Sequence, residues 1–248
     1  MSKQTGLGDQ LFVDGNDIAG DIQSIGGIST PIATLDMTGI NKEAFERQYG
    51  LADGQAEFTS FFNDAANAAH VTLSSLPRTD GQIMYLRGAG AGKSAVGLVG
   101  KRVDYSGTRG DDGSLTFGVS AQGNGTVLDW CVQVTAGKVT HASADSTDGV
   151  DLGVAPGSYG WQAYLQVFSL GSGAATITLE SSSDDGVGDT YASLGAFTEV
   201  TGSTVERIQS ASATAAVEQY VRVTTSGTFT DLVFCVIFNR NNGPRFVS

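Results

Sequence analysis

The stretch at residues 161–168, Trp-Gln-Ala-Tyr-Leu-Gln-Val-Phe, gives the clearest indication of the fold class. Its first, third, fifth and seventh residues (Trp161, Ala163, Leu165 and Val167) are apolar, whereas the second, fourth and sixth (Gln162, Tyr164 and Gln166) carry polar groups. Successive side chains of a β-strand point to opposite faces, so this alternation predicts a strand with one face in the core.

Similar runs recur along most of the chain. We predict strands at 81–88, 94–105, 114–121, 127–135, 174–180, 220–224 and 232–238. The last run, Leu-Val-Phe-Cys-Val-Ile-Phe, is apolar throughout, which is typical of a central strand covered on both faces. Clusters of turn-forming residues separate the runs, for example at 109–113, 122–125 and 183–186. Short strands at this spacing favour a mainly β fold, a sandwich or a barrel.

Two segments favour helix, and both lie in the first third of the chain. Residues 41–49 have a possible N-cap at Asn41 and a stop at Gly50. Residues 64–76 are rich in alanine, begin beside Asn63 and end at Pro77. We therefore predict a β domain with two short helices at 1–125 and a C-terminal, jelly-roll-like β-sandwich at 126–248. The polar stretch 135–158 is expected to be a long surface connection.

Composition makes several functions improbable on physical grounds. The net charge of −12 leaves no basic surplus with which to bind nucleic acid by releasing counterions from phosphates. No apolar run is long enough to span a membrane, and the N-terminus lacks the apolar stretch of a signal peptide, so we expect synthesis and folding in a cytosol. Two histidines are too few for a multi-histidine metal site, and Cys131 and Cys235 are expected to be buried thiols.

The motifs that suggest chemistry fail on their spacing. Residues 88–94, Gly-Ala-Gly-Ala-Gly-Lys-Ser, are similar to the end of a phosphate-binding loop, but Arg87 stands where its first glycine belongs and a strand follows instead of a helix. Acidic clusters at 145–151 and 183–186 do not match a calcium-binding loop. Neither histidine lies in a nucleophile motif. We therefore expect no catalytic residue, no cofactor and no metal. An exposed sugar-binding face that uses Tyr159, Trp161 and Tyr164 is a weaker alternative to a core position for these rings.

A positive indication comes from the low content of charge and proline. Only 16% of the residues are charged, and the chain has 4 prolines. Monomeric β proteins use both features to block their sheet edges, so their scarcity favours strands that are covered by further copies of the chain.

Several segments resemble the major tail proteins of long-tailed, non-contractile bacteriophages. These segments are residues 8–21 (GDQLFVDGNDIAGD), 28–40 (ISTPIATLDMTGI), 73–77 (LSSLP), 105–117 (YSGTRGDDGSLTF) and 160–168 (GWQAYLQVF). The resemblance covers most of the chain and lies in turns and strands. It implies a β-sandwich with a flanking helix that forms hexameric rings. The rings stack into a hollow virion tail tube through which phage DNA passes without specific binding.

The resemblance also implies other tail proteins as partners at the tube ends, and it allows residues from about 126 to form an outward-facing domain. Arm candidates that would contact the next ring are residues 2–10 and the loop at 88–93. The expected subunit-interface residues are Leu7, Leu11, Phe12, Val13, Ala89 and Ala91. The alternatives are a carbohydrate- or host-surface-binding module and a capsid decoration protein. We expect acidic residues to outnumber basic ones on the wall of the channel, because a basic wall would hold DNA.

Overall fold

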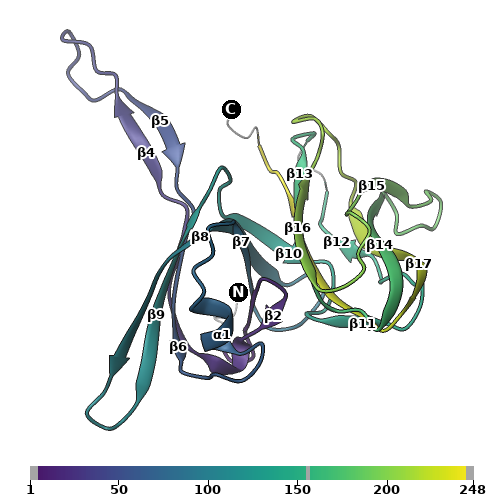
Figure 1. The fold of residues 1–248 in the computed structure, drawn as a ribbon. Coiled ribbons are helices and arrows are strands. Elements are labelled where there is room, and N and C mark those ends of the chain that lie inside the picture. Colours follow the sequence, from purple (N-terminus) through teal and green to yellow (C-terminus); the bar gives the residue numbers. More distant parts are fainter. Residues whose placement is uncertain (1–4, 155–156, 244–248) are drawn as a thin grey trace. The chain divides into compact units, whose positions relative to one another are not determined.

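The computed structural model describes residues 5–154 and 157–243, and its regular structure is almost entirely antiparallel β (Figure 1). The chain separates into two compact units that alternate along the sequence. Of the described residues, unit 1 holds those up to Gly20, Gln82–Gly97 and those from Asp129 onward, and unit 2 holds Asp21–Gly81 and Leu98–Leu128. The last crossing lies close to the predicted division at 125/126. The earlier crossings place the N-terminal residues in the same unit as the C-terminal half.

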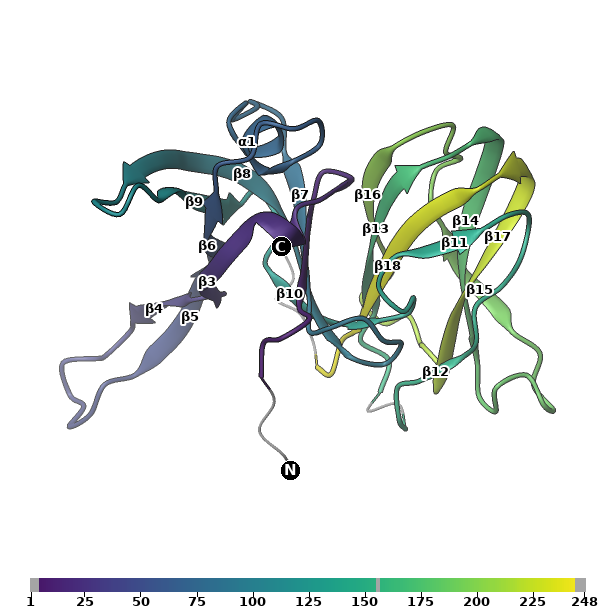
Figure 2. The ribbon, with the colours of Figure 1, turned by 90° about the horizontal axis from the view of Figure 1, so that it is seen from below.

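Unit 1 contains a β-sandwich, as the fold prediction required (Figure 2). One layer is built on β16 (Thr204–Gln209), β13 (Trp161–Ser169) and β18 (Leu232–Arg240). The other follows the order β12 (Val150–Asp151), β17 (Tyr220–Thr230), β14 (Ser172–Ser182) and β15 (Ala192–Ala196). The core between the layers contains the predicted face of β13, namely Trp161, Ala163, Leu165 and Val167.

The first layer continues beyond β18 into strands from distant parts of the sequence. These are β10 (Asp129–Gln133), the first residues of β8 (Ser94–Arg109), β7 (Gly81–Leu86), β1 (Gln10–Val13) and β2 (Asn16–Asp17), while β11 (Val139–His141) pairs with β18. Strand β18 is buried from Phe234 to Phe238, which confirms its predicted central position. Residues 135–158, predicted as a surface connection, instead contain β11 and β12, and both Thr135 and His141 are buried.

The second face of β13 is also buried, and its glutamines bind backbone groups. The side chain of Gln166 is fully buried. Its Oε1 accepts the N–H of Gly15 at 2.9 Å, and its Nε2 donates to the carbonyl oxygens of Phe12 at 3.3 Å and Gln82 at 3.2 Å. One side chain thereby joins the N-terminal hairpin, strand β7 and the sandwich across more than 150 residues of sequence.

Unit 2 is built on a four-stranded sheet in the order β3 (Ile22–Ser29), β6 (Gln55–Phe61), β9 (Leu115–Gly123) and the remainder of β8. Strands β4 (Ile32–Asp36) and β5 (Arg47–Ala52) form a separate two-stranded hairpin between β3 and β6. A short 3-10 helix at Ala19–Asp21 precedes β3, and helix α1 (Ala69–Leu73) lies between β6 and β7.

The helix predicted at 41–49 is wrong. Residues 41–46 form the end of the β4–β5 hairpin, and Arg47 and Tyr49 lie in β5, where they pair with Asp36 and Thr34. The ion pair between Lys42 and Glu46, four residues apart, is present at 2.9 Å, but it spans a turn. Hydrogen bonds across the hairpin outweighed these local helix signals, because each such bond satisfies a backbone group that would otherwise need water.

The helix predicted at 64–76 is much shorter, since α1 covers only Ala69–Leu73. The backbone of Asn67 has φ of 63°, a left-handed conformation that interrupts a helix. Asn63 accepts the N–H of Ala65 at 3.1 Å and so closes the preceding turn. The first N–H of α1, on Ala69, is instead accepted by the carboxylate of Asp21 at 3.0 Å, a cap from a distant segment.

We predict that Gln166→Ala lowers the free energy of unfolding by about 1–3 kcal/mol, because it removes the acceptor of the buried Gly15 N–H and a donor to the carbonyls of Phe12 and Gln82, of which the Gln82 carbonyl also accepts the N–H of Asp14. Guanidinium denaturation monitored by circular dichroism measures this loss. Gln122→Ala, at an exposed position in β9, is the matched control and should change stability by less than about 0.5 kcal/mol. Equal stability of the two variants would contradict the role given to Gln166.

Candidate assembly surface

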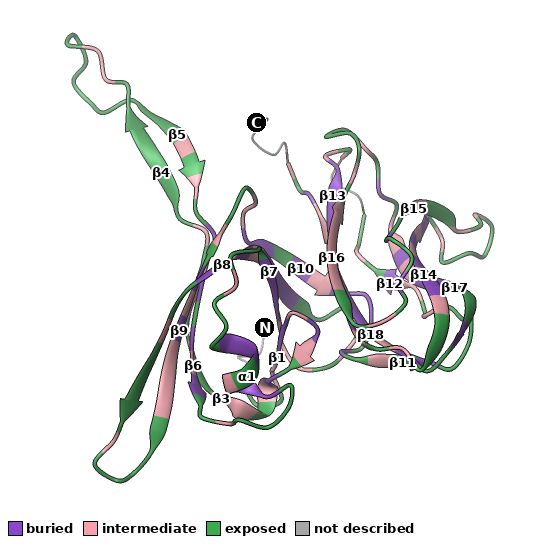
Figure 3. Cartoon of the chain, viewed as in Figure 1, coloured by how far each residue is buried: buried purple, intermediate pink, exposed green. Residues whose placement is uncertain are grey.

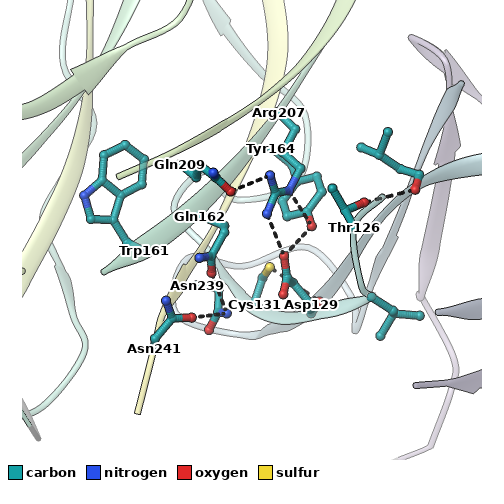
Figure 4. A network of polar contacts seen from close by, with 12 residues as sticks. Thr126, Asp129, Cys131, Trp161, Gln162, Tyr164, Arg207, Gln209, Asn239 and Asn241 are labelled. Atoms are coloured by element: carbon teal, nitrogen blue, oxygen red, sulfur yellow. Dashed lines mark hydrogen bonds and ion pairs between the residues drawn. The ribbon is translucent and has the colours of Figure 1, made fainter. Parts of the chain in front are cut away.

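A buried group of ionisable side chains lies in unit 1, around Asp129, Tyr164 and Arg207 (Figure 4). The Tyr164 hydroxyl donates to the Asp129 carboxylate, and the Nε of Arg207 donates to the Tyr164 hydroxyl at 3.2 Å. The Arg207 guanidinium also lies 3.7 Å from the same carboxylate. These residues come from β10, β13 and β16, so their side-chain contacts link three strands.

This cluster is a poor candidate for catalysis. The Asp129 side chain is fully buried, and the Arg207 side chain is 12% exposed. Burial raises the pKa of Tyr164 and of the neighbouring Cys131, which keeps the phenol and the thiol neutral. Trp161 is also buried and stacks on Phe238. With Trp161 and Tyr164 both inside, two of the three rings suggested for a sugar-binding face are unavailable to an external ligand.

The other residues with chemical potential are held in structural contacts. His70 Nδ1 lies 3.0 Å from the Tyr105 hydroxyl, and buried His141 lies 2.8 Å from Thr225 Oγ1. Burial also raises the pKa of the Cys235 thiol. Across residues 5–154 and 157–243, no group of three or more His, Cys, Asp or Glu side chains is arranged to hold a metal ion. No helix in the same ranges is long and apolar enough to cross a membrane.

Two of the three loops with suggestive sequences are held in place by hydrogen bonds. The Asp184 carboxylate accepts the N–H groups of Val187, Gly188 and Asp189, so this acidic cluster forms a tight turn. The glycine-rich loop at 88–93 links two strands, as predicted, and the Gln133 side chain donates to the Gly88 carbonyl at 2.7 Å.

The sheet of unit 2 has one covered and one open face. The covered face carries Ile22, Ile25 and Ile28 of β3 opposite Ser60, Phe58 and Ala56 of β6. The open face carries mostly small polar residues, together with the exposed ring of Phe61. Its members are Ser24, Gly27 and Ser29 of β3, Gln55, Glu57, Thr59 and Phe61 of β6, Thr116, Gly118, Ser120 and Gln122 of β9, and Lys101, Asp104, Ser106 and Thr108 of β8. Its formal charges are those of Glu57, Asp104 and Lys101, and Lys101 is paired with Asp80 at 2.7 Å.

Both edges of this sheet are open within the described chain. Strand β3 pairs only with β6, and the part of β8 from Asp104 to Arg109 pairs only with β9. Each edge therefore presents backbone N–H and C=O groups that can pair with a further strand. Strand β3 also contains two register shifts, between Ile22 and Ser24 and between Ile25 and Gly27.

The β4–β5 hairpin, which we call the arm, is exposed along most of its length (Figure 3). Seven large apolar residues are exposed on it, which are Ile32, Leu35, Met37, Ile40, Phe45, Tyr49 and Leu51. A two-stranded hairpin is marginally stable alone in water, and apolar surface of this extent marks an interaction site. Sequence reasoning missed the arm because it assigned part of it to a helix.

The predicted interface residues differ in their exposure. Leu7, Ala89 and Ala91 are exposed, whereas Leu11, Phe12 and Val13 are buried within their own chain in β1. Phe12 packs edge-on against Phe168, with ring centroids 4.9 Å apart. Of the predicted N-terminal arm at 2–10, residues 2–4 lie outside the described residues. Contact of any of these residues with another subunit stays a prediction.

Comparisons with known proteins found only distant similarities. No family model and no curated protein matches the chain. A chain from the virion of a native gene transfer agent matches with a TM-score of 0.42 and 13% identity, over 52% of this chain and 98% of that one. A chain from the tail of an empty gene transfer agent particle, with C6 symmetry, matches with a TM-score of 0.40 and 14% identity, over 52% of this chain and 98% of that one. The SPP1 Dit protein, described as a paradigm of the hub adsorption apparatus in phages that infect Gram-positive bacteria, matches with a TM-score of 0.33 and 11% identity. This match covers 93% of this chain and 98% of that one. Similarities at this level assign no function.

We predict that Arg207→Met alone destabilises the protein by about 1–3 kcal/mol, because it removes a cation that lies 3.7 Å from the buried Asp129 carboxylate and donates to the Tyr164 hydroxyl. The double variant Asp129→Leu with Arg207→Met should lose less stability than the sum of the losses of the two single variants, because the contact between them is removed only once. Chemical denaturation of the two single variants and the double variant gives the coupling free energy. Additive losses would show that the two residues do not act as a pair.

Proposed function

We propose that this chain is a structural protein of a phage virion tail, specifically a tail tube subunit that assembles as stacked hexameric rings around the path of the DNA. The observation that carries the proposal is the four-stranded sheet of unit 2, which is open at both edges and polar on one face. Its agreement with the resemblance in the sequence favours a tail protein over the alternatives.

The two open edges differ from each other, and this difference favours a ring. If β3 of one copy pairs with the outer part of β8 of the next, the interface is head-to-tail, and repetition closes into a ring when the rotation permits. Each added copy satisfies backbone groups that would otherwise remain at an edge. The number six comes from the family resemblance.

The open face is suited to line a channel for DNA. Serine, threonine, glutamine and glycine predominate on it, and it has two acidic residues against one lysine that is already paired. Such a wall offers few cations to phosphates, so DNA can pass without being retained. In this proposal the sandwich of unit 1 faces outward, other tail proteins bind at the tube ends, and the chain has no catalytic role or cofactor.

We predict that the purified chain forms six-fold rings or hollow tubes in negative-stain electron microscopy as its concentration rises. Tubes support a subunit of the tube wall, whereas single rings that never stack support a ring protein at a tube end. Small uniform particles at every concentration, including after seeding with isolated tail tips, contradict the proposal.

We also predict that Glu57→Lys with Asp104→Lys converts assembled particles that do not bind duplex DNA into particles that do. Binding should be strong near about 50 mM salt and fall steeply by about 200 mM, because it depends on counterion release. Co-sedimentation with labelled DNA measures it. The control is Asp148→Lys with Glu199→Lys, which makes the same charge change at exposed positions in unit 1. Equal DNA binding by both variants would show that the open face does not line the channel.

A further inference from the structure

An asparagine that precedes a glycine can lose its side-chain amide without any enzyme, and the chain contains two such pairs, Asn124-Gly125 and Asn242-Gly243. The backbone nitrogen of the glycine attacks Cγ of the asparagine, because no Cβ on the glycine obstructs the approach. The Cγ–Nδ2 bond then breaks, ammonia leaves, and a cyclic succinimide remains. Water opens the ring to aspartate or isoaspartate, so the reaction needs no oxidant and no cofactor.

The two pairs have similar local surroundings. Both asparagines are exposed, and the space beside Gly125 and beside Gly243 is open, with no heavy atom within 4 Å of the position that a Cβ would take. Neither glycine N–H donates a hydrogen bond to another group in residues 5–154 and 157–243, so both nitrogens are available for attack. Sequence and exposure alone therefore predict similar reactivity at the two positions.

The amide of Asn124 is held by a carboxylate of the same unit. Its Nδ2 lies 3.0 Å from Oδ1 and 3.1 Å from Oδ2 of Asp80. The Nζ of Lys101 lies 2.7 Å from Oδ1 of Asp80 and also donates to the carbonyl of Arg78. Hydrogen bonds from Lys101 and Asn124 lower the pKa of Asp80, so its carboxylate is ionised at neutral pH and accepts both contacts.

The side chain of Asn242, in unit 1, forms no hydrogen bond with any other described residue. The residue before it is firmly bound, since the Nδ2 of Asn241 donates to the carbonyl of Tyr159 at 2.9 Å and its backbone N–H donates to the carbonyl of Gly160 at 3.1 Å (Figure 4). The chain is thus fixed up to Asn241, and the next amide is exposed to water.

We infer that Asn242 is a site of spontaneous deamidation and that Asp80 protects Asn124 from the same reaction. The succinimide forms only when Cγ turns toward the glycine nitrogen and Nδ2 leaves as ammonia. At Asn124 both movements require the amide to give up its contact with a charged acceptor, whereas at Asn242 no such contact has to be broken. Asp80 acts as a positioning residue, and the inference does not depend on how the chain assembles.

The product changes the chain at the end of β18. Aspartate at position 242 adds one negative charge to a chain whose net charge is already −12. Isoaspartate also inserts one carbon into the main chain directly after Asn241, whose bonds to Tyr159 and Gly160 tie this end to the preceding segment. Old and new copies therefore differ in charge at a defined place, and anion exchange separates them.

The test follows both asparagines in the same full-length chain during incubation at mildly alkaline pH. Peptide mass spectrometry locates each conversion, and the ammonia released counts the conversions. The variant Asp80→Ala removes the contact with Asn124. The matched control is Asp53→Ala, which removes another exposed aspartate of unit 2, one that accepts from the Gln55 side chain at 2.9 Å. Circular dichroism verifies that both variants are folded.

In the folded wild-type chain we expect Asn242 to convert at least about tenfold faster than Asn124, which corresponds to about 1.4 kcal/mol between the two barriers. Asp80→Ala should accelerate conversion of Asn124 to nearly the rate at Asn242, and Asp53→Ala should leave both rates unchanged. In a chain unfolded by urea the two asparagines should convert at similar rates, because the contact with Asp80 is then absent.

Three results would overturn the inference. Equal conversion of the two asparagines in the folded wild-type chain would show that the contact with Asp80 does not protect Asn124. An unchanged rate at Asn124 in Asp80→Ala would show that protection has another source, and an equal acceleration in Asp53→Ala would show that it comes from the general order of unit 2. An Asn242 that stays intact would remove the proposed modification site. None of these results bears on the tail tube proposal.

Discussion

A strand buried on both faces must satisfy every polar group it carries from within the protein, and β13 sets this constraint for unit 1. Its apolar face fills the sandwich core, so Tyr164 and Gln166 on the other face need internal partners. Gln166 finds them in backbone groups of the N-terminal hairpin and β7, and Tyr164 finds them in Asp129 and Arg207. Segments far apart in sequence thereby become one compact unit.

In unit 2, by contrast, some backbone groups at the sheet edges and some apolar side chains have no partner within the described chain. Its sheet has a covered face of isoleucine, phenylalanine and alanine, but both edges and the arm remain exposed. A monomer in water gains nothing from an apolar hairpin of this kind. The polar groups of unit 1 are thus satisfied within the chain, whereas in the proposed assembly the edges and the arm of unit 2 are covered by further copies.

The sequence predicted those elements whose signal is local and regular. The alternation at 161–168 and the apolar run at 232–238 correspond to β13 and β18 with the expected burial. Strand β3 was missed because Ile22, Ile25 and Ile28 are spaced by three, which does not fit the period of a strand. Two register shifts bring all three to the same face, and such bulges cannot be read from one sequence. The helix at 41–49 was predicted wrongly because the prediction used only signals within the segment, whereas the conformation of Arg47 and Tyr49 depends on pairing with β4. The sequence did not reveal that β1 pairs with β7 and that Leu11, Phe12 and Val13 are buried within the chain. Their contact with another subunit stays a prediction.

Charge and apolar surface oppose each other in this protein, and the balance between them bears on when it assembles. A net charge of −12 repels one copy from another and keeps the free chain soluble, although the arm exposes seven large apolar residues. Salt screens the repulsion over a Debye length of about 8 Å at physiological ionic strength, whereas burial of apolar surface is far less sensitive to salt. An acidic, charge-poor surface with one apolar projection thus favours ordered assembly of like subunits over indiscriminate aggregation.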